Sequence, residues 1–260
     1  MAIARKTLWN WEKILMKKRL DVLVFEKGFE TSRERAKALI MAGLIYVENQ
    51  KSDKPGELYS EDVLVECKGL PLRYVSRGGL KLEKGLEFFE IRLEGRICMD
   101  VGCSTGGFTD CALQNGAKEI LAIDVGYGQF DWKLRNDSRV HLLEKTNVRY
   151  LKLKDIGGLD IDFVMIDVSF ISLTKVIPPI RELVNKNCEF LCLVKPQFEA
   201  KKGEVGKNGI IRDEKLRTEV VERVLEFLRA TGFCVRGVTE SPITGAKGNL
   251  EYLACFEQSI

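Results

Sequence analysis

From residue 81 onward, short apolar runs alternate with stretches of helical periodicity. The apolar runs are rich in β-branched and aromatic residues, which is typical of strands buried on both faces. The longest helical stretch, 213–232, places Leu216, Val220, Val224 and Leu228 on one face. This alternation predicts an α/β fold, with a mainly parallel sheet and helices on both sides of it. The predicted strands are 96–102, 119–124, 140–144, 162–167, 189–195, 233–241 and 251–258.

The last two predicted strands are joined by the short, glycine-rich segment 242–249. A connection this short joins antiparallel strands, because parallel strands need a longer crossover. The sheet is therefore expected to have an antiparallel edge strand.

The strand predicted at 189–195 ends in a charge. Residues 190–194 are all apolar or sulfur-bearing, and Lys195 then stands directly before Pro196. Lysine is almost never fully buried without a partner, and proline ends a strand ladder because it lacks an N–H group. Lys195 is expected to emerge into a crevice, where it needs partners or a task.

Residues 19–66 show a different pattern, typical of a small α+β domain. A short apolar helix is expected to end near Gly28. A second helix opens at Thr31, with Glu34 in capping-box spacing, and stops at Gly43. Strands are expected at 44–49 and 62–67, and the second helix should bury Ala36, Leu39 and Ile40.

A bridge separates these two patterns. Gly78 and Gly79 are expected to break the chain before a helix that begins near Lys81. The predicted organisation is an N-terminal extension at 1–18, a small domain at 19–66, a linker at 67–80 and the α/β domain at 81–260.

Composition narrows the class of protein. No apolar run approaches the roughly 18 residues of a membrane span, and the N-terminal sequence lacks the uncharged core of a signal peptide. We therefore expect a cytoplasmic protein with no membrane partner. Eight cysteines without a C-x-x-C pair, and a single histidine, argue against a zinc site. The cysteines are expected to be reduced core residues, and no metal is predicted.

Positive charge is concentrated near the N-terminus. Residues 17–54 contain nine Lys/Arg and six Asp/Glu, an excess equal to the net charge of +3 of the whole chain. Such clustering suits a polyanionic partner, although a solvated surface gives the same count. Arg33 and Lys37 lie four residues apart and hence on one face of the second helix.

The segment 99–110, MDVGCSTGGFTD, links the first strand of the α/β domain to a helix. At this turn of a doubly wound sheet, polar ligand groups meet free backbone N–H groups. Ser104 occupies the second glycine position of a G-x-G-x-x-G pattern, which disfavours a pyrophosphate, and Asp100 suits an amino-acid cation. Asp124, about 20 residues further on, can accept hydrogen bonds from a ribose. The turn favours S-adenosylmethionine over NAD; the other interpretation is a glycine turn that serves only tight packing.

The small domain carries the order RLD…TSRERAKALIMAGLIYVEN. This order resembles the S-four (S4, αL) RNA-binding domain found in a ribosomal small-subunit protein, pseudouridine synthases and tyrosyl-tRNA synthetases. Helix-mounted basic residues of that kind recognise the shape of folded RNA through its phosphates. The residues that the resemblance implies for RNA binding are Arg19, Ser32, Arg33 and Lys37.

The larger domain contains DVGCSTGGFTD, AIDVGYGQFDWKLRND, RYVSRGGLKL, FVMIDVSFISL, LVKPQFE and GNLEYL. With these segments the chain, from about Arg19 to its C-terminus, is similar to the hemolysin A-like (TlyA-type) ribosomal RNA 2′-O-methyltransferases, a branch of the FtsJ-like group. Cys103 departs from the alanine more common there. The resemblance implies a Rossmann-like class I methyltransferase fold, S-adenosyl-L-methionine as cofactor, and ribosomal RNA in ribosomal subunits as partner. The implied cofactor-binding residues are Asp100, Gly102, Ser104, Thr105, Gly106, Gly107, Phe108, Asp124 and Asn147.

FtsJ-like enzymes use a Lys-Asp-Lys-Glu tetrad, which the resemblance places on Lys81, Asp167, Lys195 and Glu251. Asp167 and Lys195 each end a predicted strand, at the sheet edge where α/β proteins bind ligands. Taken alone, Asp167 could equally be a helix N-cap, and Glu251 an exposed charge at a strand end. Lys195 is expected between the two carboxylates, where it positions a ribose 2′-hydroxyl and accepts its proton. Whether Lys195 is neutral or charged is left open.

The leading hypothesis is 2′-O-methylation of a ribose in ribosomal RNA, for which the resemblance implies a cytidine. The alternatives are a non-catalytic RNA-binding or ribosome-assembly protein, a pore-forming hemolysin and an NAD dehydrogenase. The span-free chain gives a pore little physical basis, and Ser104 disfavours NAD. The target nucleotide, the ribosomal subunit and the oligomeric state are not indicated.

Overall fold

The computed structural model describes residues 17–30, 32–68, 73–206, 209–245 and 248–258. The chain divides into two compact units, 1–77 and 78–260, each with its own hydrophobic core. Most of the predicted extension at 1–18 and the middle of the predicted linker at 67–80 lie outside the described residues.

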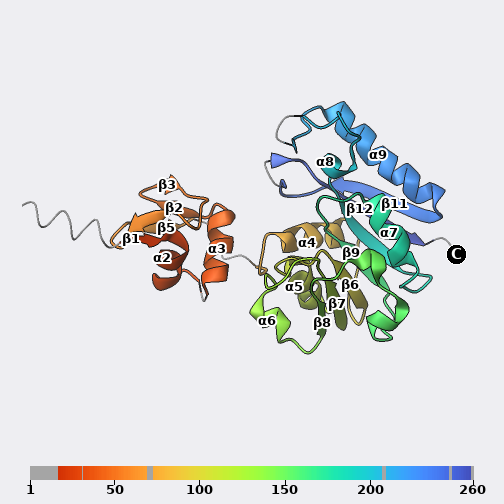
Figure 1. Ribbon diagram of the computed structural model, residues 1–260, viewed down its shortest axis with the longest axis horizontal. Coiled ribbons are helices and arrows are strands. Elements are labelled where there is room, and N and C mark those ends of the chain that lie inside the picture. Colours follow the sequence, from red (N-terminus) through yellow and green to blue (C-terminus); the bar gives the residue numbers. More distant parts are fainter. Residues whose placement is uncertain (1–16, 31, 69–72, 207–208, 246–247, 259–260) are drawn as a thin grey trace, which may run out of the picture. The chain divides into compact units, whose positions relative to one another are not determined.

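The first unit is a small α+β domain, as the sequence predicts (Figure 1). Helices α2 (Leu20–Glu26) and α3 (Arg33–Met41) pack on a three-stranded antiparallel sheet of order β3-β2-β5. Ala36, Leu39 and Ile40 are buried in this core, as expected. The strands are β1 (Lys17–Arg19), β2 (Ile45–Val47), β3 (Gln50–Lys51), β4 (Leu58–Ser60) and β5 (Val65–Cys67), and β1 pairs with β4.

Two local details of this unit differ from the prediction. The N-cap of α3 is Ser32, whose hydroxyl accepts a hydrogen bond from the Arg35 N–H at 3.2 Å. The expected cap, Thr31, lies outside the described residues. A β-hairpin also joins β2 to β3 through Glu48 and Asn49, both at positive φ, as the two-residue turns of hairpins require.

The second unit contains a seven-stranded sheet of order β11-β12-β10-β9-β6-β7-β8. Strands β8, β7, β6, β9 and β10 are parallel neighbours. The chain runs outward from β6 to β7 and β8 and then returns to the other side of β6 with β9, which makes a topological switch point between β6 and β9. The strands are β6 (Ile97–Val101), β7 (Glu119–Ile123), β8 (Val140–Leu143), β9 (Phe163–Ile166), β10 (Glu189–Val194), β11 (Phe233–Glu240) and β12 (Tyr252–Gln258).

The expected antiparallel strand pair closes one side of this sheet. β12 runs antiparallel to both β10 and β11. The reversed strand is therefore second from the edge, and β11 is the edge strand itself. β10 is thus an interior strand between β9 and β12, and all six of its residues are buried, which agrees with the continuous apolar run in the sequence.

Helices cover both faces of the sheet. On one face α4 lies beside α5 (Figure 1), and Gly85 of α4 sits so close to the Leu191 side chain that a Cβ atom would collide with it. On the other face, α7 and α9 pack on Phe190 and its neighbours. The helices are α4 (Gly78–Phe88), α5 (Gly107–Gln114), α6 (Trp132–Arg135), α7 (Leu173–Arg181), α8 (Pro196–Glu199) and α9 (Glu214–Ala230), with 3₁₀ turns η1 (Val148–Tyr150) and η2 (Leu153–Ile156).

Two sequence expectations about these helices need correction. Gly78 and Gly79 do not break the chain but form the first turn of α4, and Gly79 is buried. In α9, Val220, Val224 and Leu228 are buried as predicted, whereas Leu216 is only half-buried near the start of the helix. The cysteines match the expectation in part: all eight are free and six are buried, whereas Cys67 is half-buried and Cys234 is exposed.

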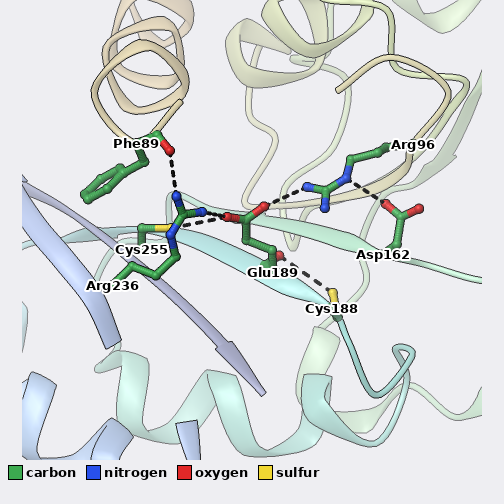
Figure 2. A network of polar contacts seen from close by, with 7 residues as sticks. All are labelled: Phe89, Arg96, Asp162, Cys188, Glu189, Arg236 and Cys255. Atoms are coloured by element: carbon green, nitrogen blue, oxygen red, sulfur yellow. Dashed lines mark hydrogen bonds and ion pairs between the residues drawn. The ribbon is translucent and has the colours of Figure 1, made fainter. Parts of the chain in front are cut away.

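A charged network ties together the amino-terminal ends of the strands (Figure 2). Glu189, which opens β10 and is 8% exposed, accepts a hydrogen bond from Arg96 Nη1 at 2.8 Å and another from Arg236. Arg236 also donates to the Phe89 carbonyl at 2.8 Å, and Arg96 lies 3.7 Å from Asp162. The Glu189 carboxylate thus connects the central strand β10 to Arg96, the residue before β6, and to Arg236 in the edge strand β11.

We expect Glu189→Ala to lower the free energy of unfolding by about 3 kcal/mol, because it leaves two guanidinium groups without their shared carboxylate. Urea unfolding followed by circular dichroism measures this change. Glu182→Ala, at an exposed position after α7, is the control and should stay within about 0.5 kcal/mol of the parent protein. A Glu189→Ala variant as stable as the control would show that the network contributes nothing.

Candidate active site

The turn after β6 is built from backbone conformations that few residues adopt. Gly102 and Gly106 have φ values of +86° and +94°, and Ser104 has φ +48°. A Cβ atom on Gly102 would lie 2.5 Å from the Asp167 carbonyl oxygen, and one on Gly106 would collide with Leu134. Tight packing therefore requires these two glycines, and Gly102 also lines the cavity described below, so packing is not the turn's only role. The same packing brings the turn against the end of β9.

Asp124, at the carboxyl end of β7, is held by the turn itself. Its Oδ2 accepts a hydrogen bond from the Ser104 N–H at 2.8 Å, and its Oδ1 accepts one from the Gly126 N–H at 2.6 Å. A carboxylate oxygen can accept more than one hydrogen bond. Asp124 therefore has a fixed orientation and spare acceptor capacity.

A cavity of about 520 Å³ opens at the carboxyl ends of β6, β7 and β9. Its volume lies in the range of small-molecule sites, and its walls are mostly apolar with a few polar groups. Four of the predicted cofactor residues line it, whereas Asp100, Thr105, Gly106, Gly107 and Phe108 do not. The lining residues are Val101, Gly102, Ser104, Ile123, Asp124, Val125, Gln129, Thr146, Asn147, Val148, Asp167, Val168, Ser169, Phe170, Ile171 and Val176.

Asp100 lies beneath the turn and is completely buried. Its Oδ2 accepts a hydrogen bond from the Thr109 hydroxyl at 2.6 Å, while Oδ1 has no hydrogen-bond partner among the described residues. Burial raises the pKa of Asp100 to about 7, against the opposing effect of the Thr109 hydrogen bond, and the negative charge of Asp167 adds to the rise. The Asp100 carboxyl has no exposed surface and lies outside the cavity lining, so no ligand in the cavity reaches it in this structure.

The four predicted tetrad residues come together at one end of the sheet, from α4, the ends of β9 and β10, and the residue before β12. Lys81 Nζ donates to Glu251 Oε2 at 2.6 Å and lies 3.8 Å from Asp167 Oδ2. Lys195 Nζ lies 2.6 Å from Asp167 Oδ1 and donates to Ser169 Oγ at 3.0 Å. Among the described residues, Lys81 contacts both carboxylates, whereas Lys195, which was expected between them, contacts Asp167 alone of the two. The four side chains are at most 20% exposed.

The geometry excludes both alternatives for the two acids, namely a helix N-cap role for Asp167 and an exposed strand-end position for Glu251. The helix after β9 is capped by Ser172, whose hydroxyl accepts a hydrogen bond from the Thr174 N–H, and not by Asp167. Glu251 is 3% exposed rather than a surface charge. Gly245 lies so close to its carboxylate that a Cβ atom there would collide with it. The segment before β12 is therefore shaped around the Glu251 side chain.

Sequence reasoning missed three residues that border this cluster. Ser169 accepts the hydrogen bond from Lys195. Glu199 accepts from the Ser172 hydroxyl and the Leu173 N–H, which fixes the start of α7 to α8. Phe170, 90% exposed at φ +63°, lies at the cavity with its ring centroid 5.0 Å from that of Phe198. The only signal in the sequence was their nearness to Asp167 and Lys195.

In the first unit, two of the predicted RNA-binding residues meet at a common partner. Arg19 and Arg33 both donate to the buried carboxylate of Asp21. Ser32 caps α3 through its side chain, and Lys37 extends from the same helix as Arg33 and is partly exposed. The structure therefore brings Arg19 and Arg33 together, from the starts of α2 and α3.

Comparisons with known proteins agree with this geometry. The family model for FtsJ-like methyltransferases matches residues 74–258, and that for the S4 domain matches residues 18–65. YqxC of Bacillus subtilis, named as a candidate rRNA methyltransferase, is 51% identical over 91% of this chain and 84% of its own. The 16S/23S rRNA (cytidine-2′-O)-methyltransferase TlyA of Mycobacterium tuberculosis is 42% identical over 90% of this chain and 87% of its own.

A solved structure described as a candidate hemolysin from Streptococcus thermophilus has a TM-score of 0.75 and 45% sequence identity, over 94% of this chain and 90% of that chain. The matched relatives thus span both units and nearly their full lengths. The chain belongs to the FtsJ-like methyltransferase family and carries an S4 domain ahead of its methyltransferase domain.

Proposed function

We propose that this protein transfers a methyl group from S-adenosyl-L-methionine to the 2′-hydroxyl of a cytidine ribose in ribosomal RNA. The observation that carries the proposal is the cluster of Lys81, Asp167, Lys195 and Glu251 beside the cavity at the switch point. Relatives named TlyA are cytidine-2′-O-methyltransferases of ribosomal RNA and match this chain over most of its length.

The residues around the cavity fit S-adenosylmethionine. Asp124 offers fixed acceptors for ribose hydroxyls, and Val125, Val148 and Ile171 give apolar walls. We propose no direct cofactor contact for Asp100, because it is completely buried and does not line the cavity. When bound, this cofactor supplies a methyl group on a positively charged sulfur.

The tetrad would act on the ribose hydroxyl. Lys195, fixed by Asp167 and Ser169, would hold the hydroxyl oxygen at the cavity. After losing its own proton, the neutral Lys195 amine would take the hydroxyl proton as the oxygen attacks the methyl group. The Lys81–Glu251 pair would fix the far side of Asp167, and the cluster has no net charge while both lysines are protonated. Both pairs are nearly closed to solvent, where such interactions are strong and orientation is preserved.

The S4 domain would bring the substrate. We assign RNA binding to residues 19–66 and methyl transfer to residues 81–260, with ribosomal subunits as the partner. A cytoplasmic location follows from this partner and is part of the proposal. Arg19, Ser32, Arg33 and Lys37 are the candidate RNA contacts.

A hemolysin is the alternative that relatives' names raise. The proposed methyl transfer requires buried lysine–carboxylate pairs beside a ligand-sized cavity, and the chain has them. Pore formation does not require such a site. None of the helices in the described part of the chain has the length and apolar character to cross a membrane.

Asp124→Ala should weaken S-adenosylmethionine binding by about 1 to 3 kcal/mol, because ligand hydroxyls lose an ionised acceptor. Isothermal titration calorimetry measures the affinity. Asp124→Asn keeps the shape and should lose less, and Asp160→Ala, at an exposed position, is the matched control. An unchanged affinity in Asp124→Ala would remove Asp124 from the cofactor site.

Lys195→Met keeps the bulk of the side chain but removes the amine, so methyl transfer should fall at least ~10²-fold. Single-turnover transfer of labelled methyl groups to ribosomal subunits measures the rate, and thermal melting of the same preparation checks the fold. Lys175→Met, on the exposed face of α7, should react normally. A folded Lys195→Met variant with near-normal turnover would exclude the catalytic role.

The paired replacement Arg33→Ala and Lys37→Ala should make the affinity for ribosomal subunits less sensitive to salt. The slope of log affinity against log salt should flatten by about one unit for every phosphate that the protein no longer neutralises. Cofactor affinity should stay the same. Arg92→Ala with Lys186→Ala removes the same charge from exposed positions of the other unit. If both pairs change the slope equally, net charge and not the S4 helix face sets RNA affinity.

A further inference from the structure

One carboxylate in the S4 domain is completely buried although it is charged. Asp21, in the first turn of α2, has no exposed surface. Its Oδ1 accepts a hydrogen bond from Arg19 Nε at 2.9 Å, and its Oδ2 accepts from Arg19 Nη2 and Arg33 Nη2, each at 3.1 Å. Burial alone would raise the pKa of Asp21, but the two arginines outweigh it and lower the pKa below its ordinary value. The group is therefore a carboxylate that two cations share.

The arginines keep binding capacity beyond this carboxylate. The side chains of Arg19 and Arg33 are 47% and 46% exposed. A guanidinium carries five N–H donors in a fixed plane, and Asp21 takes only three donors from the two groups together. No other side chain in the described part of the chain accepts a hydrogen bond from the two guanidiniums, so their remaining donors are available to a second acceptor.

Neither arginine is placed for helix stability. Arg19 is the N-cap of α2 without a capping hydrogen bond, and Arg33 is the first residue of α3. A cation at the start of a helix faces the positive end of the helix dipole, which is unfavourable. The two charges serve the buried Asp21 carboxylate, and the exposed part of each guanidinium can also meet an anion from outside the domain.

The backbone near Asp21 also fits this arrangement. The Asp21 N–H donates to the Pro55 carbonyl at 3.0 Å, which ties the start of α2 to the turn before β4. A Cβ atom on Gly56 would lie 3.2 Å from Arg19 Nη1, so the glycine leaves room for the guanidinium against the backbone. Arg19 is thus held by Asp21 on one side and bordered by this turn on another.

We propose that Asp21 is a positioning residue for RNA binding: it holds the Arg19 and Arg33 guanidiniums together so that both engage one backbone phosphate of the ribosomal RNA. Two arginines this close would repel each other and spread over many rotamers without a shared carboxylate. With Asp21 in place, their planar donor edges are ordered before the RNA arrives, which suits bidentate recognition of a phosphate. The inference rests on the proposed RNA-binding role of the S4 domain and adds a residue that touches no RNA itself.

The proposal predicts an effect of opposite sign to that of net charge. Asp21→Asn removes a negative charge from an RNA-binding domain, and long-range electrostatics alone would make RNA binding tighter. Loss of positioning makes it weaker. We expect affinity for ribosomal subunits to fall about tenfold in Asp21→Asn, the effect expected when one charge-assisted hydrogen bond to RNA is removed.

The test uses the full chain and both small and large subunits isolated from a bacterial strain that lacks this methyl modification. The parent protein must first bind and methylate one of them, and failure here would overturn the proposed function rather than the role of Asp21. The matched control is Asp53→Asn, the same chemical change at an exposed position of the same unit, which should bind as tightly as the parent or slightly more tightly. Asp21→Asn should raise the KM for subunits and leave the kcat at saturating subunits and the KM for cofactor unchanged.

Two further variants separate positioning from folding. In the background Arg19→Ala with Arg33→Ala, adding Asp21→Asn should produce no further loss of affinity, since there is nothing left to position. If Asp21→Asn does not fold, Arg33→Lys keeps the charge but not the planar fork, and it should also bind about tenfold more weakly. The proposal is overturned if Asp21→Asn binds like Asp53→Asn, if its loss of affinity persists without the arginines, or if Arg33→Lys binds like the parent.

Discussion

The constraint on which the active site depends is the near-burial of four charges at one end of a sheet. An ionised side chain out of water is unfavourable unless an opposite charge meets it at close range. Lys195 meets Asp167 and Lys81 meets Glu251, both at 2.6 Å. These residues come from parts of the chain as far apart as α4 and the start of β12, so the site exists only when the strand order brings them together.

The same strand order places the active-site residues and the stabilising charged network at opposite ends of the sheet. The carboxyl ends of β6, β7, β9 and β10 carry the cavity and the paired charges, while the amino ends carry the network around Glu189 (Figure 2). At the functional end the lysines lie beside a partly open site. At the other end, Arg96 and Arg236 are joined to one carboxylate and tie strands together. The insertion of β12 between β10 and β11 links the two ends, because it places Glu251 near Lys81 and makes β10 an interior strand.

Much of this could be predicted from the sequence wherever the signal is local or periodic. The continuous apolar run before Lys195 predicts a central strand, and the alternation of strands and helices predicts the edge where Asp167 and Lys195 meet. Contacts between distant residues carry no such signal. The pairing of Asp21 with Arg33 and the Glu189 network require knowledge of which segments are neighbours, whereas Lys81 and Glu251 were grouped only through the family resemblance. The expectations for Thr31 as a helix cap and Gly78 as a chain break failed for another reason. Several residue types suit each of those positions, and tertiary packing decides among them.

The chemistry assigned to the tetrad is methylation of a ribose hydroxyl and not of a base. The most direct test is to incubate the protein with undermethylated ribosomal subunits and methyl-labelled S-adenosylmethionine, digest the RNA to nucleosides and separate them by mass spectrometry. We expect the label to appear in 2′-O-methylcytidine. Label in a base-methylated nucleoside, or no transfer to either subunit by a protein that binds the cofactor, would contradict this assignment.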